Sequence, residues 1–122
     1  MARTMLVVDD SVTIRQMVKV CLSASGFVVL EANDGQDGLT KVQAQKVDLV
    51  ITDLHMPRMD GIELVKKIRA LPQYKYTPIL ILTTEALPAR KQEGQQAGAT
   101  GWFVKPFEPE QLLKVVKRVL PG

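Results

Sequence analysis

The segment LVITD, residues 49–53, is a short apolar run that ends in a threonine and an aspartate. Runs of this length, rich in Val, Ile and Leu, are typical of strands buried on both faces of a sheet. Comparable runs elsewhere in the chain also precede polar residues, and the polar residues at these ends are Asp9, Asp10, Asp53, Thr83 and Lys105. If the runs form parallel strands, we expect these side chains to meet at one edge of one sheet.

That edge would carry three carboxylates, a hydroxyl and an ammonium group. Carboxylates held within a few Å of one another cannot all stay ionised unaided, so the cluster is costly without a cation and an anionic ligand. The pattern therefore predicts a metal ion and a phosphoryl group at the sheet edge. Four of these residues also have an ordinary explanation when taken alone: helix capping for Asp9 and Asp10, a solvated surface for Lys105 and a strand hydroxyl for Thr83. Only their joint placement favours a functional site.

Helical periodicity between the apolar runs indicates an α/β chain. Ser11 is a suitable cap for the first helix, and Asp60 with Gly61 suits entry into the third. The fourth helix, PARKQEGQQA, has almost no apolar stripe, so we expect it to pack lightly. The expected strands are 5–8, 27–30, 47–51, 79–82 and 102–104, and the expected helical segments are 14–22, 35–45, 64–71, 88–97 and 112–120.

Five successive βα units with short loops predict a doubly wound α/β fold, in which helices cover both faces of a five-stranded parallel sheet. The polar strand ends come from the first, third, fourth and fifth strands, and the second strand contributes none. This distribution favours the flavodoxin-like strand order 2-1-3-4-5, in which the second strand is an edge and the other four are neighbours.

The 122-residue chain has the length of one domain, 1–122, and an ordinary globular composition with 46% hydrophobic and 24% charged residues. The single cysteine, Cys21, excludes an internal disulfide and lies in an apolar series, so we expect a buried, unreactive thiol. No apolar run is long enough for a signal peptide or a membrane span, which predicts a cytoplasmic protein. The net charge of +3 is modest and the basic residues lack interleaved aromatics, so nucleic-acid binding is not indicated.

Four segments carry a resemblance to a known family: LVVDDS (6–11), DLVITDLHMPRMDG (48–61), ILILTTE (79–85) and FVKPF (103–107). In this order they are similar to the receiver domain of two-component response regulators, particularly the CheY-like single-domain regulators of chemotaxis. The resemblance runs from about Thr4 to Leu120. It implies the 2-1-3-4-5 fold and signalling through a phosphorylated aspartate.

The resemblance assigns roles to the strand-end residues. It implies that Asp53 accepts the phosphoryl group, and that Mg²⁺ is held by Asp9, Asp10, Asp53 and the backbone carbonyl of His55. An ion of this kind prefers a few carboxylates, waters and phosphoryl oxygens to a full protein cage. The side chains expected to tune hydrolysis of the aspartyl phosphate are those of His55, Thr84 and Glu85.

Lys105 would pair with Asp53 before phosphorylation and with a phosphoryl oxygen afterwards, and the resemblance implies a cis peptide bond between Lys105 and Pro106. Thr83 would bond the phosphoryl group and draw the loop after the fourth strand inward. Trp102 stands at the strand-five position that would follow, where chemotaxis regulators commonly carry tyrosine. An indole is larger than a phenol and offers only an N–H donor, so we expect it to be buried less readily on activation than the usual tyrosine.

The expected function is a phosphorylation-switched response regulator. It would receive phosphate from a sensor histidine kinase and signal as a monomer by protein contact, for example to a flagellar motor switch protein. A phosphorelay intermediate or a receiver cut from a longer chain is the alternative. A phosphatase that uses an aspartyl phosphate is disfavoured, since it needs an acid two residues after Asp53, where His55 stands. A nucleotide- or flavin-binding module is disfavoured because DDSVTI replaces a glycine-rich loop after the first strand.

Overall fold

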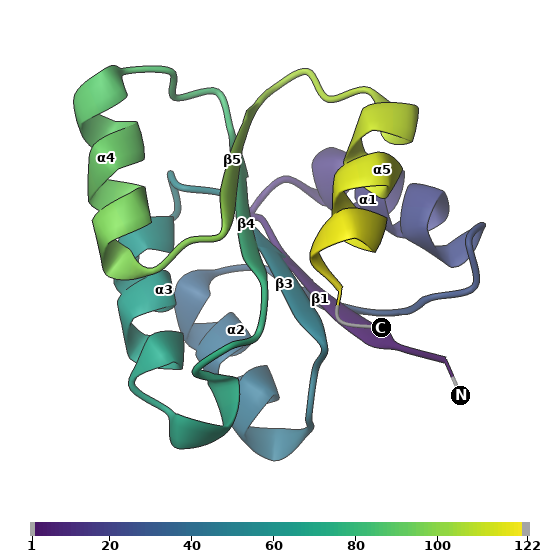
Figure 1. Cartoon of the computed structure of the whole chain (residues 1–122), viewed down its shortest axis with the longest axis horizontal. Helices are drawn as coiled ribbons and strands as arrows, with labels where there is room; N and C mark the ends of the chain where they lie inside the picture. The colour runs from purple at the N-terminus through teal and green to yellow at the C-terminus, as the bar shows by residue number, and fades with distance from the viewer. Residues whose placement is uncertain (1, 121–122) are drawn as a thin grey trace.

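The computed structural model describes residues 2–120 and contains one five-stranded parallel sheet with the order β2-β1-β3-β4-β5 (Figure 1). The predicted fold class and strand order are confirmed. The strands are β1 (Thr4–Val8), β2 (Val28–Ala32), β3 (Leu49–Thr52), β4 (Ile79–Thr83) and β5 (Gly101–Val104). The helices are α1 (Val12–Ser23), α2 (Gly35–Ala44), α3 (Gly61–Arg69), α4 (Pro88–Ala97) and α5 (Pro109–Val119), with a short 3₁₀ helix η1 at Pro72–Tyr74.

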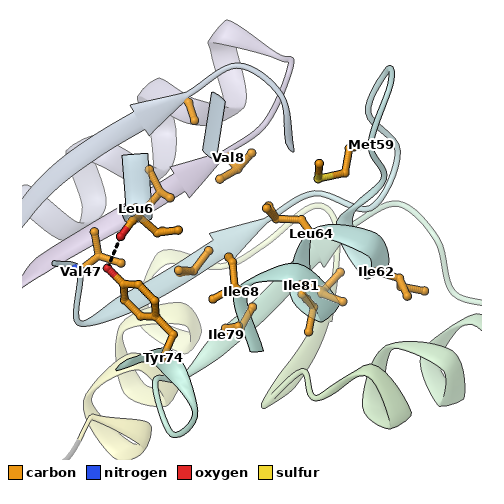
Figure 2. Close-up of a cluster of buried hydrophobic side chains, with 14 of the residues drawn as sticks. Leu6, Val8, Val47, Met59, Ile62, Leu64, Ile68, Tyr74, Ile79 and Ile81 are labelled. Atoms are coloured by element: carbon orange, nitrogen blue, oxygen red, sulfur yellow. Dashed lines mark hydrogen bonds between the residues drawn. The ribbon is translucent and has the colours of Figure 1, made fainter. Parts of the chain in front are cut away.

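The helices cover both faces of the sheet, with α2, α3 and α4 on one side and α1 and α5 on the other (Figure 1). Strand residues alternate between two buried clusters. Leu6 and Ile81 face the first cluster, where Leu64, Ile68 and other side chains of α3 pack on them (Figure 2). The second cluster lies beneath α1 and α5 and contains Met5, Ile51, Leu80, Leu22 and Val116. Strands β1, β3 and β4 are buried on both faces, and apart from one terminal threonine in each their sequences are apolar.

Three helices begin after a residue whose side chain caps the first turn. The sequence predicts such a cap at Ser11 and Asp60, and the structure adds a third at Asp34. The Ser11 hydroxyl accepts a hydrogen bond from the Ile14 N–H at 3.3 Å, and the Asp60 carboxylate accepts one from the Glu63 N–H at 2.8 Å. Asp34 does the same for α2. The third helix therefore starts at Gly61, as its entry sequence predicts, but it ends at Arg69, two residues before the expected Leu71. Leu71 instead precedes η1.

Helix α4 is lightly packed, as its sequence predicts: its one buried residue is Gly94. Its N-cap, Leu87, makes no side-chain capping bond and is 61% exposed. Its C-terminal end is fastened by Arg69 of α3, whose guanidinium donates to the carbonyls of Gly98 (3.0 Å), Tyr74 (2.7 Å) and Thr77 (2.6 Å). Burial lowers the pKa of Arg69 below its usual value.

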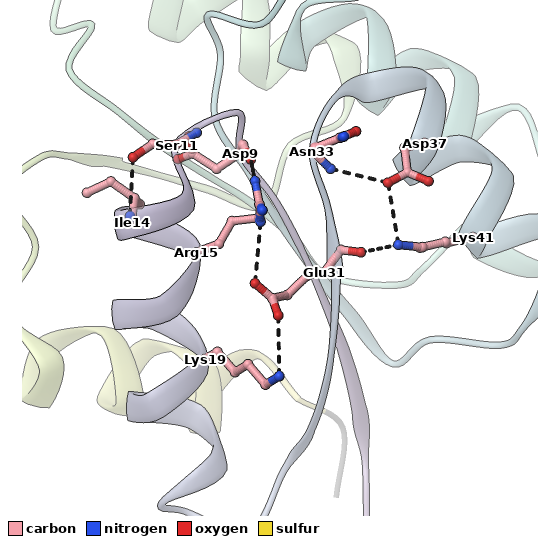
Figure 3. Close-up of polar contacts among 9 residues, drawn as sticks. All are labelled: Asp9, Ser11, Ile14, Arg15, Lys19, Glu31, Asn33, Asp37 and Lys41. Carbon is pink, nitrogen blue, oxygen red and sulfur yellow. Dashed lines mark hydrogen bonds and ion pairs between the residues drawn. The ribbon is translucent and has the colours of Figure 1, made fainter.

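Three further expectations need correction: the third strand, expected over 47–51, runs over Leu49–Thr52, and the other two concern β2 and Cys21. Strand β2 extends past Leu30 to Ala32, because a polar residue is tolerated in an edge strand when it finds partners: Glu31 pairs with Arg15 and Lys19 of α1 at 3.3 Å each (Figure 3). Cys21 is only partly buried. Its thiol donates to the Pro109 carbonyl at 3.6 Å, and desolvation raises its pKa above 9.0, so it stays a neutral thiol at physiological pH.

Candidate metal and phosphoryl site

The backbone ladder of the sheet continues past the strand ends and fixes the positions of the polar residues. The Asp53 N–H donates to the carbonyl of Val8 at 2.9 Å, and the Lys105 N–H donates to the carbonyl of Thr83 at 2.8 Å. The Asp9 N–H in turn donates to the carbonyl of Ala32 at 3.1 Å. The residue after each strand is therefore held in register with its neighbour, and the five predicted strand-end residues gather at one edge.

Three carboxylates at this edge are close enough to share one cation. Asp9, Asp10 and Asp53 each offer an oxygen, and these oxygens lie within 4.8 Å of one another. Asp9 and Asp53 are buried, with exposures of 2% and 8%, whereas Asp10 is exposed. Hard divalent cations such as Mg²⁺ prefer oxygen ligands of this kind and retain several waters, which an exposed side of the site permits. The donor set therefore fits the predicted magnesium ion.

Lys105 supplies the positive charge of the cluster. Its ammonium nitrogen lies 2.9 Å from Asp9 Oδ2 and 3.5 Å from Asp53 Oδ2, and its side chain is 12% exposed. The expected pairing with Asp53 is present, but the shorter contact is to Asp9, which the sequence did not indicate. One cation thus faces two buried carboxylates, and a net negative charge remains to attract a metal.

Asp9 is the carboxylate that Lys105 contacts most closely. Burial raises its pKa above the usual 3.8, and the charge of Asp53 adds to this; the hydrogen bonds from Lys105 and from the Ser11 N–H (2.9 Å) act in the opposite direction. Its backbone carbonyl accepts a 2.6 Å hydrogen bond from Arg15, which is also paired with Glu31 (Figure 3). Arg15 therefore fastens α1 to the end of β1, a contact for which the sequence holds no local signal.

Asp53 has one constrained and one available oxygen. Its Oδ1 accepts a hydrogen bond from the Leu54 N–H at 2.7 Å, and its Oδ2 is the atom nearer Lys105. Because the first contact fixes the carboxylate plane, Oδ2 is held beside the cation. A carboxylate placed in this way can act as a nucleophile toward phosphorus once its charge and that of the incoming group are neutralised.

The chain passes very close to Asp53 at the start of α3. The Gly61 N–H donates to the Leu54 carbonyl at 2.8 Å, and a Cβ at Gly61 would lie 2.2 Å from the Asp53 carbonyl oxygen and 3.0 Å from the Leu54 Cα. These neighbours are backbone atoms, which cannot move aside as a side chain does. Glycine at this position therefore lets α3 begin directly beneath the candidate site.

We expect Gly61→Ala to lower the free energy of unfolding by about 3 kcal/mol, at the upper end of the usual cost of overpacking. Urea denaturation followed by circular dichroism measures the change. Gly26→Ala is the matched control: Gly26 has φ +88° but nothing within 4 Å of an added Cβ, so it should lose only about 1 kcal/mol, from backbone strain. Equal losses for the two variants would contradict the close approach at Asp53.

The residues expected to tune hydrolysis follow two neighbouring strands: His55 lies after β3, and Thr84 and Glu85 lie after β4. The Glu85 N–H donates to the Thr83 hydroxyl at 3.3 Å, and Glu85 Oε1 lies 3.5 Å from Nε2 of His55. Thr83 is fully buried, His55 and Thr84 are exposed. A hydroxyl that accepts one hydrogen bond keeps its own proton for donation, so Thr83 can still donate to an anion at Asp53.

Trp102 lies on β5 and is partly buried. Its indole N–H donates to the backbone carbonyl of Glu85 at 3.0 Å, so Glu85 contacts Thr83 through its N–H and Trp102 through its carbonyl. The resemblance placed Thr83 and Trp102 in one switch but did not show that the backbone of Glu85 joins them. At the end of β5, the Lys105–Pro106 peptide bond is cis.

Comparison with known proteins places this geometry in a family. Residues 5–117 match the family described as response regulator receiver domain. The chain is 42% identical over 118 residues to the chemotaxis protein CheY1 of Helicobacter pylori, with 95% of each chain covered. It is 36% identical to the transcriptional regulatory protein ResD of Bacillus subtilis, where the match covers 94% of this chain and 47% of that protein.

Solved structures agree with the sequence matches. The chemotaxis protein CheY4 of Vibrio cholerae superposes with a TM-score of 0.94 at 52% identity, covering 98% of this chain and 100% of that chain. A CheY-like receiver domain protein from Methanospirillum hungatei superposes with a TM-score of 0.92 at 28% identity, covering 97% and 93%. The chain therefore belongs to the response regulator receiver domains, the signalling modules of two-component systems, and is CheY-like.

Proposed function

We propose that this protein is a phosphorylation-switched response regulator that accepts a phosphoryl group on Asp53, with Mg²⁺, and signals by protein contact. The observation that carries the proposal is the buried Asp53 carboxylate, which has a cation 3.5 Å from Oδ2 and two further carboxylates within 4.8 Å. A structural ion pair needs one carboxylate for each cation. A surplus of negative charge at a sheet edge instead favours a divalent ion and a transferred anion.

In the proposed reaction, Asp53 Oδ2 attacks the phosphorus of a phosphohistidine on a sensor histidine kinase. The new bond joins Oδ2 to phosphorus, the bond from phosphorus to the imidazole nitrogen breaks, and its electron pair stays on that nitrogen. Lys105 neutralises a phosphoryl oxygen, and Leu54 N–H keeps the carboxylate in line. Bound Mg²⁺, held by Asp9, Asp10, Asp53 and the backbone carbonyl of His55, would neutralise the developing charge on the phosphoryl oxygens.

The phosphoryl group acts as a switch only if it interacts differently with two conformations. We propose that the Thr83 hydroxyl donates to a phosphoryl oxygen and that Glu85 transmits the change to Trp102. A shift from mostly inactive to mostly active needs a difference of roughly 3–5 kcal/mol. New charge-assisted bonds from Thr83 and Lys105 can contribute on this scale.

His55, Thr84 and Glu85 flank the path by which water would reach the aspartyl phosphate. In the proposal they tune its hydrolysis, because polar groups there can orient a water or block it. The pair between His55 and Glu85, at 3.5 Å, spans this entrance. Catalysis is then directed at the protein's own phosphoryl group, and we propose no external substrate beyond the phosphodonor.

The proposed setting is chemotaxis, with residues 1–122 forming a single receiver domain that acts as a cytoplasmic monomer. Two of the similar proteins are named chemotaxis proteins, and each is covered nearly end to end. No helix within residues 2–120 is both long and apolar enough to cross a membrane. A flagellar motor switch protein is then the proposed target. The alternative is a phosphorelay intermediate or a receiver from a longer chain, since the match also covers 47% of a transcriptional regulator.

A pull-down with beryllofluoride-activated protein tests the proposal. We expect enrichment of a motor switch protein when Mg²⁺ and beryllofluoride are both present, and no enrichment when either is omitted or when Asp53→Ala replaces the wild type. Enrichment of a histidine phosphotransfer protein in its place would favour the phosphorelay reading. Capture that does not depend on Asp53 would contradict the switch itself.

A further inference from the structure

Gly94 is an unusual choice for the middle of a helix. It lies in the interior of α4 and is that helix's one buried residue. Glycine weakens a helix relative to alanine, because it loses more backbone freedom on folding. Helix α4 has no apolar stripe to compensate for this. A buried glycine at this position therefore needs a reason in its surroundings.

The surroundings of Gly94 are filled by the indole of Trp102. A Cβ at position 94 would lie 2.8 Å from Cζ3 and 3.0 Å from Cε3 of the ring, closer than carbon atoms approach one another. The third neighbour, Cδ1 of Ile81, would be 3.2 Å away and is the end of a flexible side chain. The six-membered ring of the indole therefore lies directly against the backbone of α4, in space that the side chain of any residue other than glycine would occupy.

The opposite end of the indole holds the loop between β4 and α4. Its N–H donates to the Glu85 carbonyl at 3.0 Å, and the Glu85 N–H donates to the Thr83 hydroxyl at 3.3 Å. A rigid ring cannot keep one end on the carbonyl if its other end is pushed away from the helix. A cavity of about 230 Å³ adjoins the ring and is lined by Trp102 together with Lys91, Gln95 and Gly101. A displaced indole has room to move into this cavity.

We infer that Gly94 is a positioning residue of the switch: by leaving room for the indole, it holds the Trp102 N–H on the Glu85 carbonyl and so keeps the loop in place beside Thr83. The placement of the indole stands on the contacts alone. Only the last step, from the loop to the phosphoryl response, rests on the proposed function. The tryptophan on β5 and the glycine on α4 are then one matched pair.

A double-mutant cycle in stability tests the contact without any phosphoryl group. In the wild-type background, Gly94→Ala should lower the thermal unfolding midpoint by about 4 °C, because the added methyl displaces the ring. In a Trp102→Ala background the same change should raise the midpoint by about 4 °C, because alanine then gives only its better helix propensity. Trp102→Phe, with a smaller ring, should give an intermediate result and serves if the alanine variant folds poorly. An equal rise in every background would overturn the inference.

Fluorescence reports the position of the ring directly, since Trp102 is the one tryptophan in the chain. We expect Gly94→Ala to move the emission maximum to longer wavelength in the absence of Mg²⁺ and beryllofluoride, as the indole becomes more exposed. Gln92→Ala, at an exposed position of the same helix, is the control and should leave the spectrum unchanged. A spectrum of Gly94→Ala identical to that of the wild type would also overturn the inference.

The coupling to the site is measured by titration with beryllofluoride at saturating Mg²⁺, followed by amide chemical shifts. Loss of the bond to Glu85 should raise the half-saturating concentration of Gly94→Ala about 2–10-fold, the range that corresponds to one neutral hydrogen bond. If wild type does not respond to beryllofluoride, the proposed function fails while the stability cycle and the spectrum still test the contact. If wild type and Gly94→Ala respond alike, Gly94 positions the ring but not the switch, and the inference fails.

Discussion

Asp53→Asn should gain no phosphoryl group when it is incubated with acetyl phosphate and Mg²⁺, under conditions in which the wild type is modified. The amide oxygen of asparagine is a far weaker nucleophile than a carboxylate oxygen. The substitution also removes one of the three carboxylates that could hold the metal. Intact mass spectrometry separates the modified and unmodified chains. The variant should fold normally, because an amide oxygen can still accept the hydrogen bond that Leu54 N–H now gives to Asp53.

Asp60→Asn is the control for that experiment. Asp60 lies in the same segment of chain, between β3 and α3, and its carboxylate caps α3. Asparagine caps helices about as well as aspartate, so the control changes one charge near the site without changing the nucleophile. It should be phosphorylated like the wild type. A stable phosphoryl group on Asp53→Asn would mean that another residue is the acceptor.

Lys105→Met should separate metal binding from phosphoryl transfer. Removal of the ammonium group leaves Asp9 and Asp53 facing each other without a cation, so we expect Mg²⁺ to bind at least about threefold more tightly. Phosphorylation by acetyl phosphate should nevertheless slow by about 10²-fold, the usual cost of losing one group that neutralises charge in a transition state. Calorimetry measures the first quantity and the time course of intact mass the second.

The opposite signs of these two effects are diagnostic. Lys114→Met removes the same unit of charge from an exposed position on α5 and should change neither quantity. If Lys105 were only a structural partner of Asp9, its loss would change stability while the rate at saturating Mg²⁺ stayed near that of the wild type. That result would contradict the role proposed for Lys105.

Much of the site could be predicted because parallel strands impose a register. Once β1, β3, β4 and β5 are recognised, the residue after each strand must lie at the same edge, and Asp53 and Lys105 follow from this rule alone. The weak packing of α4 could also be predicted, because its sequence has no apolar stripe. Chain-wide periodicity carries information of this kind, and it needs no side-chain geometry.

The contacts that join the site to the rest of the molecule could not be predicted in the same way. They depend on where side chains from distant segments meet. Examples are the closer pairing of Lys105 with Asp9, the hydrogen bond from Trp102 to Glu85 and the packing of the indole against Gly94. In the sequence, Gly94 is only a glycine within a helix that has no apolar stripe. The reason for glycine at this position becomes clear only when the indole of Trp102 is found packed against it. Distances of a few tenths of an ångström decide such contacts, and no pattern in the sequence encodes them locally.

The unequal ends of α4 have a consequence for how a signal would spread. The N-cap residue Leu87 is exposed and offers no side-chain cap to the first turn, whereas the C-cap residue Gly98 accepts a hydrogen bond from Arg69 through its carbonyl. Fraying is therefore favoured at the first turn and opposed at the last, so the helix has a gradient of local stability along its axis. A disturbance that arrives through the loop after β4 meets the least stable turn first. The conformation of the surface that α4 forms would then change progressively from the first turn of the helix to the last, while the sheet beneath the helix keeps its structure.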